Sequence, residues 1–209
     1  PNVWNFFGSD FRPQAHPDNV RFGDQPVLNV EHADDGALWS MSPAGVQLHC
    51  DEYGPWASSK GLLINFEKMK ALIFGTRPWV LPTITLQGRA LEWSMETKYL
   101  GIVFCSTAMD IFKEHSLQLA KKALHICNVT LAMEQFLGDI HPRAGLAIYS
   151  ARVDSLLTYG AQIVVVTVDR TLRQLERVQI TFFCRLLHVH KCSMIATLHS
   201  ETGFVPIWY

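Results

Sequence analysis

Apolar residues follow two different spacings along the chain, and the spacing changes near residue 106. In the first part, short apolar runs alternate with turn-forming residues, a pattern typical of strands. Ser42 followed by Pro43 is typical of a helix start, and we expect that helix to run to about Ser58. The expected strands are residues 27–30 and 37–41 around an Ala33–Gly36 turn, 62–64, 71–74, 84–86 and 90–93 around Gln87-Gly88, and 98–104.

Beyond residue 106 the apolar positions recur every three or four residues, which indicates amphipathic helices. His141-Pro142 opens a helix that ends at Gly160, and another begins at Asp169 or Thr171. The apolar positions of the first helix are Leu117, Ala120, Leu124, Cys127 and Leu131, and those of the third are Leu172, Leu175, Val178, Phe182, Leu186 and Val189. The expected fold class is α+β, with a mixed front half at residues 1–106 and an all-helical back half at residues 107–209.

Composition narrows the class of protein. Hydrophobic residues make up 48% of the 209 residues and charged residues 18%, which excludes a disordered or coiled-coil chain. The best apolar run, Ile163–Val166, is far shorter than the ~20 residues that span a membrane. The chain starts at Pro1 without a signal peptide, so we expect a piece of a longer intracellular protein, nuclear or cytoplasmic. Scattered cysteines favour reduced thiols over a disulfide framework: Cys50, Cys105, Cys127, Cys184 and Cys192.

Charge is divided unevenly along the chain. The net charge of −1 conceals −4 over residues 1–112 and +4 over residues 113–191. Arg170, Arg173 and Arg177 lie three and four residues apart, opposite the apolar stripe of the third helix. Such a row suits phosphate groups, and it is also compatible with an ordinary solvated helix face. An acidic half followed by a basic half indicates two functions side by side.

Asp34 and Asp35 stand together at the tip of the first expected hairpin. Adjacent carboxylates are costly to hold without a counter-charge, and binding a divalent cation such as Mg²⁺ is one purpose that requires them. Two such cations stabilise the attacking and leaving oxygens in phosphoryl transfer. The alternative is a surface turn without a role, because Asp and Gly are residues that tight turns favour.

Other candidate sites have less support. Residues near the end of the third helix could supply a zinc set: Cys184, His188, His190 and Cys192. On a continuous helix, however, the two cysteines would lie ~12 Å apart along the axis, too far to share one ion. No Gly-rich phosphate loop, dinucleotide fingerprint or Gly-x-Ser-x-Gly elbow is present. The tryptophans of the front half are expected in its core: Trp56, Trp79 and Trp93.

Several segments occur in an order typical of one enzyme family. They are Pro1-Asn2-Val3-Trp4-Asn5-Phe6-Phe7 with Asp10, Glu31-His32-Ala33-Asp34-Asp35, Gly61-Leu62-Leu63-Ile64-Asn65-Phe66-Glu67-Lys68-Met69-Lys70, Lys98-Tyr99-Leu100-Gly101, Leu156-Leu157-Thr158-Tyr159-Gly160-Ala161, and Leu175-Glu176-Arg177-Val178-Gln179 with Arg185-Leu186-Leu187. Their order and spacing resemble the reverse transcriptases of non-LTR (LINE-like) retrotransposons over nearly the whole chain. No single segment is specific, and the ordered set carries the resemblance.

The resemblance implies a partial polymerase palm, an antiparallel hairpin sheet with a packed helix, followed by a thumb-like helical region. Asp34 and Asp35 would be the metal-binding carboxylates, with Mg²⁺ or Mn²⁺ held weakly by this chain alone, and Lys68 would lie near the phosphates of the incoming nucleotide. The primer end would be gripped by Lys98, Tyr99, Leu100 and Gly101. Contacts to the nucleic-acid backbone would come from Lys113, Lys121, Lys122, Arg170, Arg173 and Arg177. The implied partners are an RNA template and a DNA primer in the intact parent, with no membrane.

The chain departs from the family pattern in ways that affect catalysis. His32 stands where the family has an aromatic residue beside the primer terminus, and Met69 replaces the Thr of a Lys-Thr-Lys segment. The third catalytic carboxylate and the fingers would precede Pro1, so we expect this chain not to polymerise DNA alone. The alternative is a degenerate or repurposed remnant that binds nucleic acid or protein without catalysis. A palm cut through its sheet would expose apolar surface, so self-association is also expected.

Overall fold

The structure, a computed structural model, describes residues 10–27, 29–32 and 35–207. They form an α+β protein with small antiparallel hairpins and several helices. The chain divides into two compact units, Pro1–Leu100 and Gly101–Tyr209, which we call the hairpin unit and the helical unit. Within the described ranges, no helix combines the length and the apolar character needed to cross a membrane.

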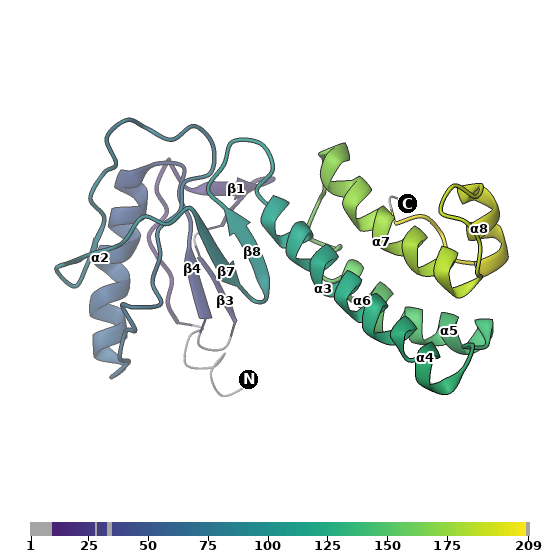
Figure 1. The fold of residues 1–209 in the computed structure, drawn as a ribbon. Helices are drawn as coiled ribbons and strands as arrows, with labels where there is room; N and C mark the ends of the chain where they lie inside the picture. The colour runs from purple at the N-terminus through teal and green to yellow at the C-terminus, as the bar shows by residue number, and fades with distance from the viewer. Residues whose placement is uncertain (1–9, 28, 33–34, 208–209) are drawn as a thin grey trace. The chain divides into compact units, whose positions relative to one another are not determined.

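The described residues of the hairpin unit form small antiparallel hairpins, of which Figure 1 labels β3 and β4. They join β1 (Val20–Phe22) to β2 (Gln25–Val27), β3 (Asn29–His32) to β4 (Asp35–Leu38), and β5 (Thr85–Leu86) to β6 (Arg89–Ala90). The expected turn at Gln87-Gly88 is confirmed, because both residues have the positive φ of a tight hairpin turn, 49° and 77°.

The hairpin that carries the paired aspartates differs from expectation in its register. Asp35 pairs with His32 and Gly36 pairs with Glu31, so Asp35 and Gly36 belong to a strand. The prediction of a four-residue turn at Ala33–Gly36 is therefore wrong. This register leaves two positions between the strands, the loop length that antiparallel hairpins favour most. Those positions, Ala33 and Asp34, lie outside the described residues.

The expected first helix is confirmed as α2 (Pro43–Ser59). Ser42 caps its start, because the Ser42 Oγ accepts a hydrogen bond of 3.1 Å from the backbone N–H of Gly45. Figure 1 shows α2 beside the strands of the hairpin unit, and it contacts β4 and β5. The core there is built from Cys50, Ile84 and Leu86, with partly buried Leu38, Val46, Tyr53, Ile64, Phe66, Met69, Leu91 and Trp93 around them.

Two expected strands are absent from the described residues of this unit. Residues 62–64 and 71–74 form no ladder, and their nearest approach to one is a single bridge between Ala71 and Trp93. Periodicity alone cannot decide whether a short apolar run forms a strand, and here the first run supplies only Ile64 to the core. The expected strand 98–104 is also wrong as one element. It is divided into β7 (Glu96–Tyr99) and β8 (Ile102–Cys105) by Leu100 and Gly101, whose φ values are positive, 49° and 83°.

The placement of the tryptophans in the core is correct only in part. Trp56 and Trp93 are partly buried, but Trp79 is fully exposed. Trp79 lies in the irregular segment between the Ala71 bridge and β5, which carries no strand that could turn the side chain inward.

The helical unit contains β8 and the three helices that the apolar spacing predicts. Its elements are α3 (Lys113–Ala132), α4 (Glu134–Leu137), α5 (Pro142–Ile148), the π-helical turn η1 (Tyr149–Asp154), α6 (Ser155–Leu157), α7 (Asp169–Leu186) and α8 (Ile195–Thr202). In Figure 1, α3 runs beside α7, and it also contacts η1 and α6. The π-helical turn interrupts the expected second helix, while α4 and α8 are too short to show a clear apolar period.

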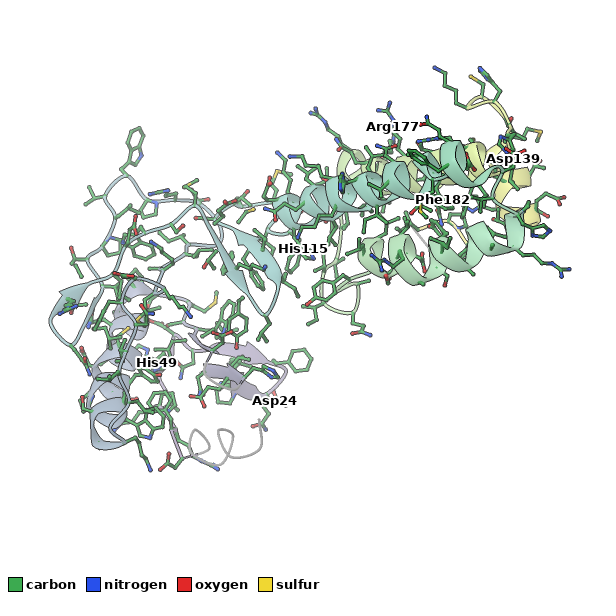
Figure 2. The ribbon with its side chains drawn as sticks, turned by 60° about the horizontal axis from the view of Figure 1, so that its bottom comes forward. Asp24, His49, His115, Asp139, Arg177 and Phe182 are labelled. Atoms are coloured by element: carbon green, nitrogen blue, oxygen red, sulfur yellow. The ribbon has the colours of Figure 1, made fainter. Side chains whose placement is uncertain are left out.

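The core of the helical unit lies between these helices. Phe182 and Phe183 of α7 are fully buried against Tyr149, with ring centroids 5.2 and 4.6 Å from it, and Figure 2 shows Phe182 inside the unit. Leu124 was expected on the apolar face of α3, but its side chain is 39% exposed. The buried face of this helix passes through Ala123 instead.

Candidate functional site

Tyr99 joins two segments of the hairpin unit that are far apart in the sequence. Its hydroxyl donates toward the carbonyl oxygens of Val30, at 3.2 Å, and Asp35, at 3.3 Å. Burial raises the pKa of Tyr99, and the negative charges of Asp35 and Glu31 raise it further. The hydroxyl therefore stays protonated and remains a donor. The segment resembling a primer grip is thus attached to the hairpin that carries Asp35.

The register of that hairpin places Glu31 and Asp35 one position apart on its paired strands, so their side chains lie on opposite faces. Asp35 is exposed on β4 opposite His32, which is also exposed, whereas Asp34 lies outside the described residues. Glu31 accepts a hydrogen bond of 3.2 Å from the side-chain amide of Asn29, and burial raises the pKa of Glu31. Among the described residues, no group of three or more metal-ligating side chains is placed to hold an ion. Asp35 therefore offers one carboxylate, and a divalent ion here would need Asp34 and further oxygen ligands.

Lys68 is presented by a turn that Asn65 organises. The side-chain oxygen of Asn65 accepts hydrogen bonds from the backbone N–H groups of Glu67 and Lys68, at 3.1 and 3.4 Å. Met69, the next residue, packs against the core, so Lys68 is left exposed to solvent. Within the described part of the chain, no ion pair joins Lys68 to Asp35. The structure thus brings Tyr99, and not Lys68, into direct contact with the hairpin.

Gly101 contacts Tyr159 within the helical unit. Gly101 has a φ of +83°, and a β-carbon at this position would lie 2.6 Å from the Tyr159 hydroxyl oxygen. The adjacent imidazole of His115 is 2% exposed and lies near the start of α3 in Figure 2. Its Nδ1 accepts from the backbone N–H of Val103, and its Nε2 donates to the carbonyl oxygen of Tyr159, each at 3.4 Å. Two of the segments that carry the family resemblance therefore meet, and the contact requires glycine at position 101.

A concavity of about 730 Å³ lies on the helical unit along the outer side of α7. We call it the basic concavity. Its basic lining residues are Arg173, Arg177, Arg185, His188, His190 and Lys191, and its carboxylates are Glu134 and Glu176. Figure 2 shows Arg177 at the outside of the unit, away from the buried Phe182. Four permanent cations face two carboxylates, so the surface attracts anions.

The basic residues predicted for backbone contacts divide into two groups. Arg173 and Arg177 line the basic concavity, but Arg170 does not. The remaining predicted residues are exposed on α3: Lys113, Lys121 and Lys122. The guanidinium of Arg185 donates to the side-chain oxygen of Asn128 on α3 at 2.9 Å. Lys121 lies seven residues before Asn128 and so on the same side of α3, which extends the basic surface from α7 toward that helix.

The sequence analysis missed the part of the basic concavity formed after α7. No backbone contact was assigned to Arg185 on the last turn of α7, nor to the residues that follow the helix, His188, His190 and Lys191, and the helix was expected to reach Val189. Instead α7 ends at Leu186, His188 has a φ of +52°, and the backbone N–H of Val189 donates to the Cys184 carbonyl oxygen at 2.9 Å. The continuous helix assumed in weighing a zinc site is therefore wrong. The signal was the density of basic residues and histidines between positions 185 and 191.

Comparison with known proteins relates the chain to a polymerase. No family model and no solved structure matches it. The chain is similar to the RNA-directed DNA polymerase from the mobile element jockey of Drosophila melanogaster, with 30% identity over 108 residues. The match covers 49% of this chain but 12% of that polymerase, so the chain spans a small part of its relative. This similarity supports an origin related to reverse transcriptases.

Proposed function

We propose that the chain is part of an RNA-directed DNA polymerase of retrotransposon type, and that its helical unit binds the backbone of the nucleic acid. The similarity to the jockey polymerase and the order of the segments between Glu31 and Leu187 support this proposal. In the intact parent, the reaction would be metal-dependent transfer of nucleotides to a primer end.

The basic concavity is the observation that carries the binding half of this proposal. Arginine presents a planar fork of N–H donors that matches the oxygens of a phosphate group. Arg173, Arg177 and Arg185 supply such forks along one helix, and Lys191 adds a further charge from the turn that follows. Successive phosphates of a nucleic-acid strand would meet successive cations, and binding would release counterions into the solution.

The hairpin unit would serve the chemical step in the intact parent. Asp34 and Asp35 would hold Mg²⁺, which stabilises charge on the transferring phosphoryl group when it is bound. The contribution of this chain is to fix the hairpin, because Tyr99 ties the backbone of Asp35 to β7. Lys68, exposed on its Asn65 turn, would approach the phosphates of the nucleotide. Two carboxylates leave most of the coordination shell of Mg²⁺ to water, so the chain alone is expected not to extend a primer.

The alternative is a module that binds nucleic acid without catalysis. The basic concavity favours this alternative, because every residue that lines the concavity belongs to the helical unit and none to the hairpin with Asp35. In that case, binding would be the whole activity and would not depend on divalent ions.

Fluorescence anisotropy with a labelled RNA–DNA hybrid duplex tests the proposed function. Replacing Arg177 and Lys191 together with alanine should weaken binding about tenfold or more, because two phosphate contacts are lost. Arg143 is another exposed arginine, on α5 outside the basic concavity, so Arg143→Ala is the control and should bind like the unchanged chain. Equal weakening by both variants, or none by the double variant, would refute the role of the basic concavity. Primer extension that Asp35→Asn abolishes would show that the chain is active alone.

A further inference from the structure

Residues 75–82 form a loop of the hairpin unit whose apolar tip is in solvent. Trp79 is fully exposed, and Val80 beside it is 84% exposed. A tryptophan side chain has a large apolar surface that folding normally removes from water. An exposed tryptophan with an exposed apolar neighbour therefore indicates a contact that forms only on binding.

Both ends of this loop are fixed to the hairpin unit. At the first end, Phe74 stacks on Trp39 with ring centroids 6.0 Å apart. At the other end, the indole N–H of Trp93 donates to the carbonyl oxygen of Pro82 at 2.7 Å. Ala71, just before the loop, is also held by backbone hydrogen bonds of 2.9 Å with Glu92 and Ser94. The exposed tip is thus carried on a closed and anchored base.

The tip itself is restricted by proline. Pro78 directly precedes Trp79, and Pro82 closes the loop. Proline fixes its own φ and also restricts the backbone angles of the residue before it. Pro78 therefore restricts Arg77 as well. A restricted loop loses little conformational entropy when a ligand binds. The loop therefore presents Trp79 in a form suited to recognition.

Charge indicates which ligand fits the tip. Arg77 lies two residues from Trp79, is exposed, and contacts the Met95 sulfur through its guanidinium. Between residues 71 and 91 the chain carries two cations, Arg77 and Arg89, and no carboxylate, although the hairpin unit as a whole is acidic. An apolar pocket on a partner protein gains nothing from this positive surround, whereas a nucleic-acid strand is complementary to it. Aromatic faces combined with cations are the usual means of binding single strands.

We propose that Trp79 stacks on a base of single-stranded nucleic acid and that Arg77 binds the adjacent phosphate. The inference rests on the proposed function insofar as the ligand is a nucleic acid. It adds a second binding site on the hairpin unit, formed by residues that the basic concavity does not include. Stacking needs an unpaired base, so this site distinguishes single strands from duplexes.

Anisotropy titration of the full chain with a short, labelled oligouridine tests the site. Trp79→Ala should weaken binding about thirtyfold, the mid-range loss for one stacked base. Trp79→Phe keeps an aromatic face and should restore most of the affinity. Leu63→Ala is the matched control, because Leu63 is another fully exposed apolar side chain of the same unit, and it should bind normally.

The same variants separate this inference from the proposed function. Trp79→Ala should leave binding of the hybrid duplex unchanged, while the Arg177 and Lys191 double variant weakens it. If Trp79→Ala binds oligouridine normally, or weakens single strands and duplexes equally, the stacking site is refuted and the basic concavity stands. If Trp79→Ala instead lowers self-association in sedimentation equilibrium and leaves oligouridine binding intact, the loop docks on protein and the inference is wrong.

Discussion

Replacing Gly101 with alanine should destabilise the helical unit through one contact. The new β-carbon would lie 2.6 Å from the Tyr159 hydroxyl oxygen and 3.3 Å from the ring carbons beside it. A side chain at a φ of +83° costs about 1–2 kcal/mol by itself. Forcing a methyl group into the contact adds about 1–3 kcal/mol. Tyr159 is 48% exposed, so its ring can move aside, and the cost of the clash lies at the lower end of that range. We expect a total loss of roughly 2–3 kcal/mol.

Gly203 provides the matched control for this substitution. It also has a positive φ, +72°, in the helical unit, but nothing lies within 4 Å of a β-carbon there. Gly203→Ala should therefore cost only the conformational part, about 1–2 kcal/mol. Both substitutions lower the entropy of the unfolded chain equally, so that contribution cancels in the comparison.

Urea unfolding followed by far-UV circular dichroism measures both variants, because the helical unit supplies most of the helical signal. Adding Tyr159→Phe to Gly101→Ala removes the closest atom and should recover about 1 kcal/mol relative to the sum of the single changes. Equal unfolding free energies for Gly101→Ala and Gly203→Ala, or no recovery in the double variant, would refute the contact between the two segments.

Three further predictions follow from local geometry. Gly145→Ala should lower the unfolding free energy by about 1–2 kcal/mol in urea, because its β-carbon would clash with the buried Leu186 side chain. This clash outweighs the gain of about 1 kcal/mol in helix propensity, and an unchanged midpoint would contradict the packing of α5. Ser42→Ala should cost about 1 kcal/mol by removing the cap of α2, also measured in urea, and no loss would mean that the cap is not formed. Burial raises the pKa of Glu31, so the folded protein favours the protonated carboxyl and loses stability as pH rises and this group ionises. Glu31→Gln should therefore raise Tm at pH 7 and not at pH 4. An equal shift in Tm at both pH values would contradict burial as the cause.

The parts of the fold that were predictable are those with complete local signals. Ser42-Pro43 combines a capping side chain with a fixed φ, so the start of α2 was correct to the residue. Gln87-Gly88 lies between two apolar runs and suits a tight turn, so the hairpin was predicted correctly. The long apolar stripe of α7 likewise gave a correct helix, although Val189 lies beyond its end.

The errors arose where tertiary contacts decide the structure. Nothing local marks Ile64 as a core residue carried by a loop, because a short apolar run suits a strand equally well. Trp79 was expected in the core from composition, but the anchoring of Phe74 and Pro82 turns it outward. The turn at His188, which brings His190 and Lys191 to the basic concavity, depends on a left-handed residue that is not glycine. The contact of Tyr99 with the hairpin, in turn, joins residues 64 positions apart.

The candidate site was predicted in its residue types more than in its arrangement. Arg173 and Arg177 were identified from helical spacing, and both line the basic concavity. Arg185 continues the same face of α7, and Lys191 joins them only because the chain folds back after Leu186. Asp34, at the centre of the catalytic expectation, lies outside the described residues, and its role stays a prediction.

The salt dependence of binding to the RNA–DNA hybrid duplex reports whether phosphates bind in the basic concavity. If phosphates bind in the basic concavity, the logarithm of the association constant should fall linearly with the logarithm of salt concentration. Removing Arg177 and Lys191 should then reduce that slope by about 0.9 for each lost contact, whereas Arg143→Ala should leave it unchanged. A slope that is the same for the unchanged chain and the double variant would contradict the account.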